Sequence, residues 1–453
     1  MQVYFIDHAP ASGDSYLSTS HLECHSALRP PLRFLVPVSL LSLIVATRIA
    51  SAQDHAGHSD SVQRIAIGAQ AIGLVTRQSP LIADDPATEG YLTQPTLMAH
   101  ASVWQDVLTL QLMLSLEGLT LERGELNPGM VGEGYIDRRH PHTYLHELTA
   151  TLERGIGRAR GSLTIGKGFA PFGTDDPMAR PFVKYPINHH LAQILERIVA
   201  IAAVSAGPIG LEAGTFNGDE PESAGDAPNR DRLWDSWAAR ATLAPVANAE
   251  MQLSHARVRS PELASGGGPD DRKWSASVRY GGIDRRRYAL AEWARTTQYV
   301  GSSPSFDFNS FLSEAAGAAG PLMVAGRLEV SERPDEERLI DPFRTVQGGH
   351  DFNILGRSRW TIATVRVAAP NSSESRVRVV SFVELAHHWV RETLRPSGFS
   401  PEQFYGSDRI WTISVGAKLG FGAIHSRMGR YGAAVTGQRG MNAGQPTRPP
   451  HAH

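Results

Sequence analysis

The chain has 453 residues, and its 44 Lys and Arg nearly balance its 46 Asp and Glu. This near-neutral charge excludes the strongly basic surface of a typical nucleic-acid-binding protein, so we expect no nucleic-acid partner. Charged residues are only 20% of the chain and 43 residues are Gly, which suits one large β structure as well as several soluble domains.

The N-terminal region predicts export from the cytoplasm. Arg29 and Arg33 precede the apolar run 34–47, and the small residues 50–52 (Ala-Ser-Ala) follow it. A positive flank, a short apolar run and an A-x-A-type site together indicate a secretory signal peptide. A single anchor helix is the alternative, although such a helix needs roughly 20 apolar residues. The one cysteine, Cys24, precedes the expected cleavage site, so the mature chain would have no disulfide.

From residue 64 onward, apolar and polar residues alternate with a period of two. Leu occupies every second position of 108–116, and the segments 273–280, 322–331 and 411–421 alternate in the same way. Such alternation gives a strand one apolar and one polar face. Runs of about ten residues match a tilted strand that crosses a bilayer.

The pattern predicts about sixteen strands, within a range of 14–18. We expect them near residues 64–75, 92–104, 107–118, 143–153, 157–168, 196–205, 208–216, 233–244, 248–258, 272–281, 286–297, 307–317, 320–331, 352–369, 376–391 and 408–421. Their connections alternate between short turns and long polar loops, as in outer-membrane barrels. The sequence therefore predicts an all-β fold, a single antiparallel transmembrane β-barrel with long loops on one side and short turns on the other.

This reading divides the chain into four parts. Residues 1–52 are an N-terminal extension with the signal peptide, and 53–63 are a disordered segment that contains His. Residues 64–422 form the barrel, and 423–453 form a polar tail that we expect to be disordered.

Two motifs carry a family resemblance. Residues 166–174 (GKGFAPFGT) resemble the G-K-x-x-x-P-F-G stretch of porin-like outer-membrane proteins, which include phosphate-selective-type porins and an uncharacterised bacterial porin superfamily. Residues 207–218 look like the hairpin strand that follows it, and the sequence Arg-His-Pro-His at 139–142 is also similar. The resemblance covers residues 90–220 by motif. It implies a channel in the outer membrane of a Gram-negative-type bacterium. The short turns all fall on one side of the expected barrel, and with an even number of strands both termini lie on that periplasmic side.

The C-terminus departs from that family. Many such barrels end on an aromatic residue, whereas about thirty residues follow Phe421 here. Either this tail hangs in the periplasm, or residues 425–431 form another strand.

Histidines are the candidate metal ligands, because imidazole is a common ligand of Zn, Cu and Ni. The candidates form three groups along the chain: His55 and His58; His140, His142 and His146; and His189 and His190. We expect no obligate cofactor, and a divalent metal is the alternative.

The long segment 169–195 is the candidate constriction, because in general porins a long loop folds inward and narrows the channel. Its charged residues are Asp175, Asp176, Arg180 and Lys184. We expect them to face basic residues of the wall, namely Arg160, Arg240 and Lys273. Arg279 is a further candidate for the lining of the pore. The alternative is a surface loop.

These features predict a porin-like channel for passive diffusion of small hydrophilic solutes or ions, surrounded by outer-membrane lipid. The sequence contains no G-x-S-x-G, P-loop or H-E-x-x-H motif, and we expect no catalytic residues and no enzyme activity. The alternatives are a His-rich outer-membrane protein for metal binding or uptake, and an exported β protein without a transport role. A homo-oligomer is a further expectation, from the resemblance alone.

Overall fold

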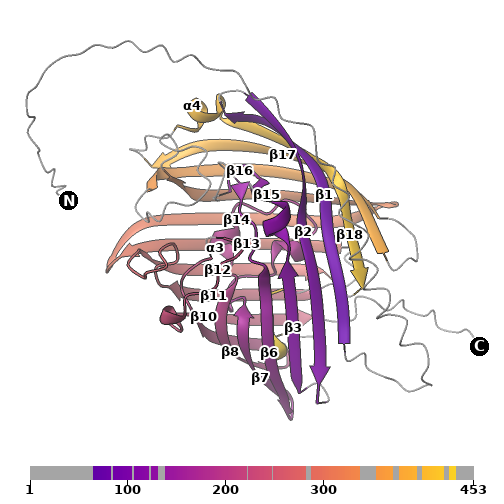
Figure 1. Cartoon of the computed structure of the whole chain (residues 1–453), viewed down its shortest axis with the longest axis vertical. Coiled ribbons are helices and arrows are strands. Elements are labelled where there is room, and N and C mark those ends of the chain that lie inside the picture. The colour runs from indigo at the N-terminus through magenta and orange to yellow at the C-terminus, as the bar shows by residue number, and fades with distance from the viewer. Residues whose placement is uncertain are drawn as a thin grey trace, which may run out of the picture. The chain divides into compact units, whose positions relative to one another are not determined.

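The computed structural model describes residues 65–434, with gaps at 83–84, 105–106, 122–123, 131–137, 222, 247, 282–286, 337–353, 371–376, 395–399 and 423–427. Sixteen antiparallel strands form one closed barrel in these residues (Figure 1). Each strand pairs with its sequence neighbour in the wall, and β1 pairs with β18 to close the sheet. The signal peptide, His55 and His58 lie outside the described residues.

The strands of the barrel are long. Their bounds are β1 Ile65–Ile82, β2 Asp85–Val103, β3 Leu108–Ser115, β6 Leu145–Ile156, β7 Ala159–Gly168, β8 Arg197–Ala206, β9 Ile209–Phe216, β10 Ser236–Val246, β11 Ala249–Val258, β12 Asp270–Gly281, β13 Arg287–Val300, β14 Ser303–Ala319, β15 Leu322–Glu336, β16 Ile354–Pro370, β17 Val377–Leu394 and β18 Arg409–Gly422. Each of the sixteen strands expected from the sequence overlaps one of these, so the predicted all-β barrel is confirmed.

Connections differ at the two ends of the barrel. At one end, which we call the turn end, β6–β7, β8–β9 and β14–β15 are joined by residues 157–158, 207–208 and 320–321. At the other end, the loop end, lie longer connections such as 169–196 and 217–235. The β1–β2 and β13–β14 connections are exceptions, because only residues 83–84 and 301–302 join these strands at the loop end. Since the strand number is even, β1 begins and β18 ends at the turn end.

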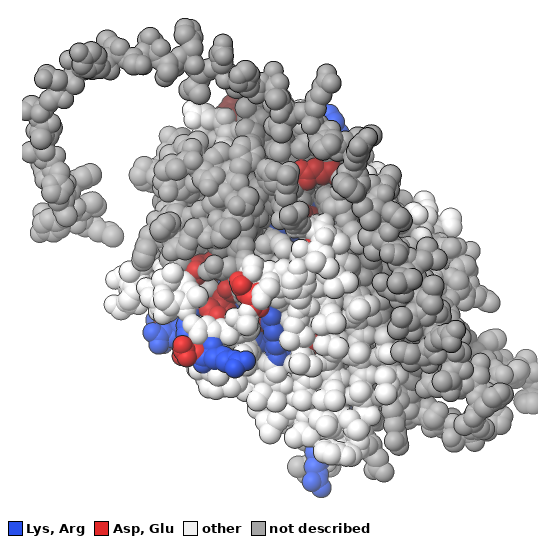
Figure 2. Space-filling view, viewed as in Figure 1, with Lys and Arg blue, Asp and Glu red and all other residues white. Residues whose placement is uncertain are grey.

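The two faces of the wall have different chemistry. Outward side chains are large, apolar and exposed, as for Leu163, Leu211 and Leu253, whereas their neighbours Thr164, Glu212 and Ser254 face inward and are buried. Much of the visible described wall is uncharged, and charged side chains gather toward its ends (Figure 2). Trp237, Trp274 and Trp411 belong to the outer face, whereas Trp360 is only 1% exposed and lies inside.

Small elements line the loop end and the interior. A two-stranded sheet pairs β4 (Glu125–Leu126) with β5 (Arg138–Arg139). The short helices are α2 Glu117–Thr120, η1 Pro177–Ala179, α3 His189–Ala192, η2 Arg230–Arg232, α4 Pro401–Tyr405 and η3 Gly432–Ala434. Among the described residues, no helix has the length and apolar character that a membrane crossing requires.

Candidate functional site

The connection between β7 and β8 turns into the barrel, and we call residues 169–195 the inner segment. Its Phe169, Phe172 and Tyr185 are at most 3% exposed and share one apolar cluster with wall residues such as Val199 and Phe216. Burial of these rings against the inward face of the wall holds the segment inside the lumen. The alternative of a surface loop is therefore wrong for this segment.

Backbone groups of the inner segment bond to the wall across the lumen. The amide of Gly173 donates to Ser254 Oγ of β11 at 3.0 Å. The amides of Val183 and Lys184 donate to the Glu384 carboxylate of β17 at 2.9 and 3.1 Å. Side chains of the wall therefore accept hydrogen bonds from backbone amides that an irregular segment leaves unpaired.

Ion pairs fix the middle of the inner segment. Arg180 Nη2 lies 3.3 Å from Glu292 Oε2 of β13, and Nη1 lies 3.9 Å from Glu314 Oε1 of β14. Burial alone would lower the pKa of the Arg180 guanidinium, but these two carboxylates raise it above its ordinary value. Arg327 Nη1 of β15 donates to the Lys184 carbonyl at 2.9 Å. Removal of one partner from such a buried pair costs about 3–5 kcal/mol, because it leaves a buried charge.

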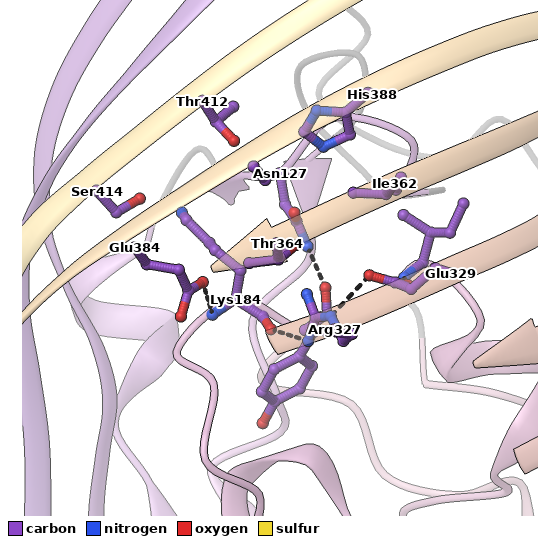
Figure 3. A pocket seen from close by; sticks show the side chains of 13 residues that line it. Asn127, Lys184, Arg327, Glu329, Ile362, Thr364, Glu384, His388, Thr412 and Ser414 are labelled. Atoms are coloured by element: carbon purple, nitrogen blue, oxygen red, sulfur yellow. Dashed lines mark hydrogen bonds and ion pairs between the residues drawn. The ribbon is translucent and has the colours of Figure 1, made fainter. Parts of the chain in front are cut away.

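Lys184 joins the inner segment to the small β4–β5 sheet. Its Nζ lies 3.0 Å from Glu125 Oε1, donates to the Leu126 carbonyl at 2.8 Å and contacts the Tyr91 hydroxyl. The remaining cavity beside Lys184 offers only about 10 Å³ to water, roughly the room for one molecule. Figure 3 shows its lining, in which Glu384, Arg327 and Glu329 of the wall lie around Lys184 of the inner segment. The lumen is narrow at this level.

Two of the three predicted wall partners, Arg240 and Lys273, meet the inner segment, and so does the further pore candidate Arg279. Arg279 Nε lies 3.1 Å from Asp175 Oδ2, Lys273 Nζ donates to the His190 carbonyl at 2.9 Å, and Arg240 Nη1 donates to the Gly173 carbonyl at 3.0 Å. The expectation that Arg160 faces the segment is wrong. Arg160 lies at the start of β7 near the turn end, where it pairs with Glu153 at 3.0 Å, whereas the segment leaves from the other end of the strand.

The structure explains why the G-K-x-x-x-P-F-G stretch ends on a glycine, which is Gly173 here. Its φ is +72°, and a Cβ added there would overlap the Ala192 carbonyl oxygen. We expect Gly173→Ala to destabilise the barrel by more than about 1–2 kcal/mol, since it adds this overlap to the cost of the left-handed conformation. The loss of stability is measured by urea unfolding, with heat-modifiable gel mobility as the signal for the folded barrel. Gly267→Ala is the control, because its nearest atom would be a Leu263 side-chain carbon at 3.7 Å. Equal stabilities would contradict this reading.

The five described candidate histidines come together at the loop end. The ring centroids of His142 and His146 are 4.6 Å apart, and His142 is 6.3 Å from His189. His190 is 5.5 Å from His189 and 5.4 Å from His140. The inward course of the inner segment brings together two groups that are far apart in sequence, one before and at the start of β6 and one at α3.

Carboxylates accompany the buried histidines. His142 Nδ1 lies 2.8 Å from Glu117 Oε2, and His146 Nδ1 lies 2.7 Å from Glu196 Oε1. His189 Nε2 is 3.8 Å from Asp176 Oδ2.

Two of these imidazoles are neutral near pH 7. Burial lowers the pKa of His189 to about 4, although Asp176 opposes the shift. Burial and the neighbouring His190 lower the pKa of His140 to about 4. A neutral imidazole is the form that binds a metal.

The C-terminal residues 428–434, which we call the terminal segment, also lie inside the barrel. Arg430 Nη2 lies 2.6 Å from Glu250 Oε1, and Arg430 Nη1 lies 3.5 Å from Glu212 Oε2. The Tyr431 hydroxyl accepts the Phe169 amide at 3.0 Å, and the Ala433 amide donates to Ser162 Oγ at 3.0 Å. For these residues the expected disordered tail is wrong, and so is the alternative of a further strand. The rest of 423–453 lies outside the described residues.

Comparisons with known proteins give structural likeness only. No protein-family profile matches the chain, and no curated protein matches it. The chain is similar to a high-pH structure of OprB from Pseudomonas putida, with 11% identity, a TM-score of 0.48, and coverage of 79% of this chain and 94% of that one. It is also similar to an anion-selective porin from Comamonas acidovorans, with 10% identity, a TM-score of 0.46, and coverage of 79% and 99%. At these identities neither protein assigns a solute to this chain.

The sequence did not point to several residues of the site. Glu117, Glu196 and Glu220 pair with histidines. In the sequence, however, Glu117 and Glu196 stand singly at the ends of expected strands, and Glu220 is one of several acidic residues in a polar loop. In the sequence, Arg139 stands out only as part of a motif. In the structure its Nη2 lies 2.7 Å from Glu117 Oε1 and its Nε lies 3.0 Å from Glu125 Oε2. Its place directly before the histidines was the one available signal.

Proposed function

We propose that the mature chain is an outer-membrane β-barrel that conducts small hydrophilic solutes or ions through a lumen narrowed by the inner segment. The observation that carries this proposal is the closed barrel with an apolar outer face and a charged inner face. In a bilayer a closed sheet satisfies every backbone group of its wall, and an apolar outer band faces lipid. The turn end would then be periplasmic, together with both chain ends.

The narrow lumen favours ions and small solutes over large ones. Inward side chains from many strands, such as Thr151, Arg240 and Glu292, are at most 2% exposed. No catalytic step is part of the proposal. A homo-oligomer is proposed only from the family resemblance, and the mass of the detergent-bound protein tests it.

Planar-bilayer recording on the folded full chain tests the proposed channel. Discrete conductance steps that vanish on heat denaturation are expected. A protein that enters the membrane and shows heat-modifiable mobility, yet gives no steps at any voltage, would contradict the channel while leaving the barrel intact.

A charge on the outer face tests the lipid-facing position of the wall. Leu163 lies near the middle of β7 and its side chain is 64% exposed. We expect Leu163→Arg to lower the stability of the barrel in lipid vesicles by about 2–4 kcal/mol, because an arginine near the bilayer midplane is costly. Val246→Arg, at the turn end of β10, is the control and should cost about 0–1 kcal/mol. Similar losses for both variants would argue against a membrane-embedded wall.

A further inference from the structure

Three possible ligands meet at the loop end of the barrel, on three separate parts of the chain. His140 precedes β6, His190 belongs to α3 of the inner segment, and Glu220 lies between β9 and β10. One ligand atom from each lies within 4.8 Å of the others. No local sequence pattern connects these residues, so the fold alone brings them together.

Hydrogen bonds orient the two imidazoles. His140 Nδ1 lies 3.3 Å from the Pro141 carbonyl oxygen. A carbonyl oxygen only accepts, so Nδ1 carries the hydrogen and Nε2 keeps its lone pair. His190 Nδ1 lies 3.1 Å from Glu220 Oε1, and its Nε2 is buried without a hydrogen-bond partner. The contact of His140 with the Pro141 carbonyl is of the kind that fixes the tautomer and ring orientation of a histidine ligand in metal sites.

The ligand set selects a class of metal. Two imidazoles and one carboxylate suit Zn²⁺ and similar borderline transition metals, whereas Mg²⁺ and Ca²⁺ prefer oxygen ligands. We propose that His140, His190 and Glu220 form a binding site for a divalent transition metal of the Zn²⁺ class. Three protein ligands leave a fourth position for water. The site goes beyond the proposed channel, because a barrel can conduct whether or not this site is filled.

Neighbouring cations limit the affinity of the site. Arg197 Nη2 lies 3.5 Å from Glu220 Oε2, and Lys273 Nζ donates to the His190 carbonyl. Glu220 can bind a metal through Oε1 while Oε2 keeps Arg197, but the positive charge of Arg197 opposes the metal. The site is therefore suited to reversible binding rather than to a permanent structural ion.

The exposure of the ligands is compatible with loading from the loop end. The side chains of His190 and Glu220 are 33% and 26% exposed, whereas His142 and His189 are 3% and 5% exposed. The row of imidazoles therefore begins at the accessible His190, beside Glu220, and leads to the buried His142 and His189.

Calorimetric titration of the folded full chain with Zn²⁺ alone tests the site. We expect the double variant His190→Gln, Glu220→Gln to bind one Zn²⁺ fewer than the unchanged protein, or to bind that ion at least about tenfold more weakly. His387→Gln is the matched control, because His387 packs against Trp389 and Trp411 away from the cluster and should bind as the unchanged protein does. Counting the difference in bound ions separates this site from histidines elsewhere in the chain.

Two results would overturn the metal site. One is an unchanged protein that binds no Zn²⁺, and the other is a double variant with the same number and affinity of bound ions. Heat-modifiable mobility of the double variant shows whether it still folds, and Glu220→Gln alone offers a milder change if it does not. Conductance recorded on the same samples tests the proposed channel independently.

Discussion

Deletion of residues 175–190 is expected to raise the single-channel conductance of the barrel several-fold. These residues make up most of the inner segment and contact the wall from β12 to β17. In the intact protein the carboxylates of Glu292 and Glu384 bond to this segment. Its removal leaves wider, hydrated space beside them. Conductance through a water-filled passage rises as its narrowest section widens.

The deletion leaves a loop that can close. The Ala170 amide donates to the Ile194 carbonyl at 3.0 Å, so the two ends of the inner segment run side by side. Removal of residues 263–267 from the β11–β12 connection is the control, because that connection lies at the loop end and should change conductance little. If the barrel folds and its conductance does not rise, the inner segment is not the constriction.

Arg430→Met is expected to release the terminal segment from the lumen. The side chain of Arg430 is 1% exposed, and it bonds to Glu250, Glu212 and the Thr242 hydroxyl, the last at 3.0 Å. Methionine keeps much of the volume but none of the charge. Loss of one partner from a buried ion pair costs about 3–5 kcal/mol, enough to detach a segment of this length.

Hydrogen exchange over residues 428–434 measures the release, and protection there should fall while the strands stay protected. Conductance should also rise, because the segment occupies the lumen toward the turn end. Arg409→Met is the control, since Arg409 is 66% exposed and its pair with Asp408 should contribute about 0–1 kcal/mol. Unchanged protection in Arg430→Met would show that apolar contacts, such as those of Tyr431, hold the segment without the ion pairs.

The sequence predicted the wall better than the contents of the lumen. In a strand with one apolar and one polar face, apolar and polar residues alternate with a period of two. All sixteen strands therefore left a local signal in the sequence. The inner segment was found because it is long, rich in proline and bounded by a motif. Its wall partners were partly predicted, since inward parity identified Arg240 and Lys273. Arg160 shares that parity, but its height along β7 cannot be read from a period of two.

The terminal segment and Glu220 could not be predicted in this way. The tail reads as polar and rich in glycine, and the residues that bury it, Glu212 and Glu250, are 218 and 180 positions away in sequence. Glu220 is one of several acidic residues in a polar loop, and nothing local distinguishes it from the others. In both cases the closed barrel creates the neighbourhood, and no local pattern carries that information.

The position of the terminal segment also bears on the order of assembly. It follows β18 after residues 423–427, and β18 is the strand that pairs with β1 to close the seam, with Gly422 opposite Gly68. Its partners on β9, β11 and the inner segment converge only in a barrel whose earlier strands have already curled into place. We therefore expect Arg430 to enter its site only after these strands have paired, so that protection of residues 428–434 would report a wall that is already formed on that side of the lumen.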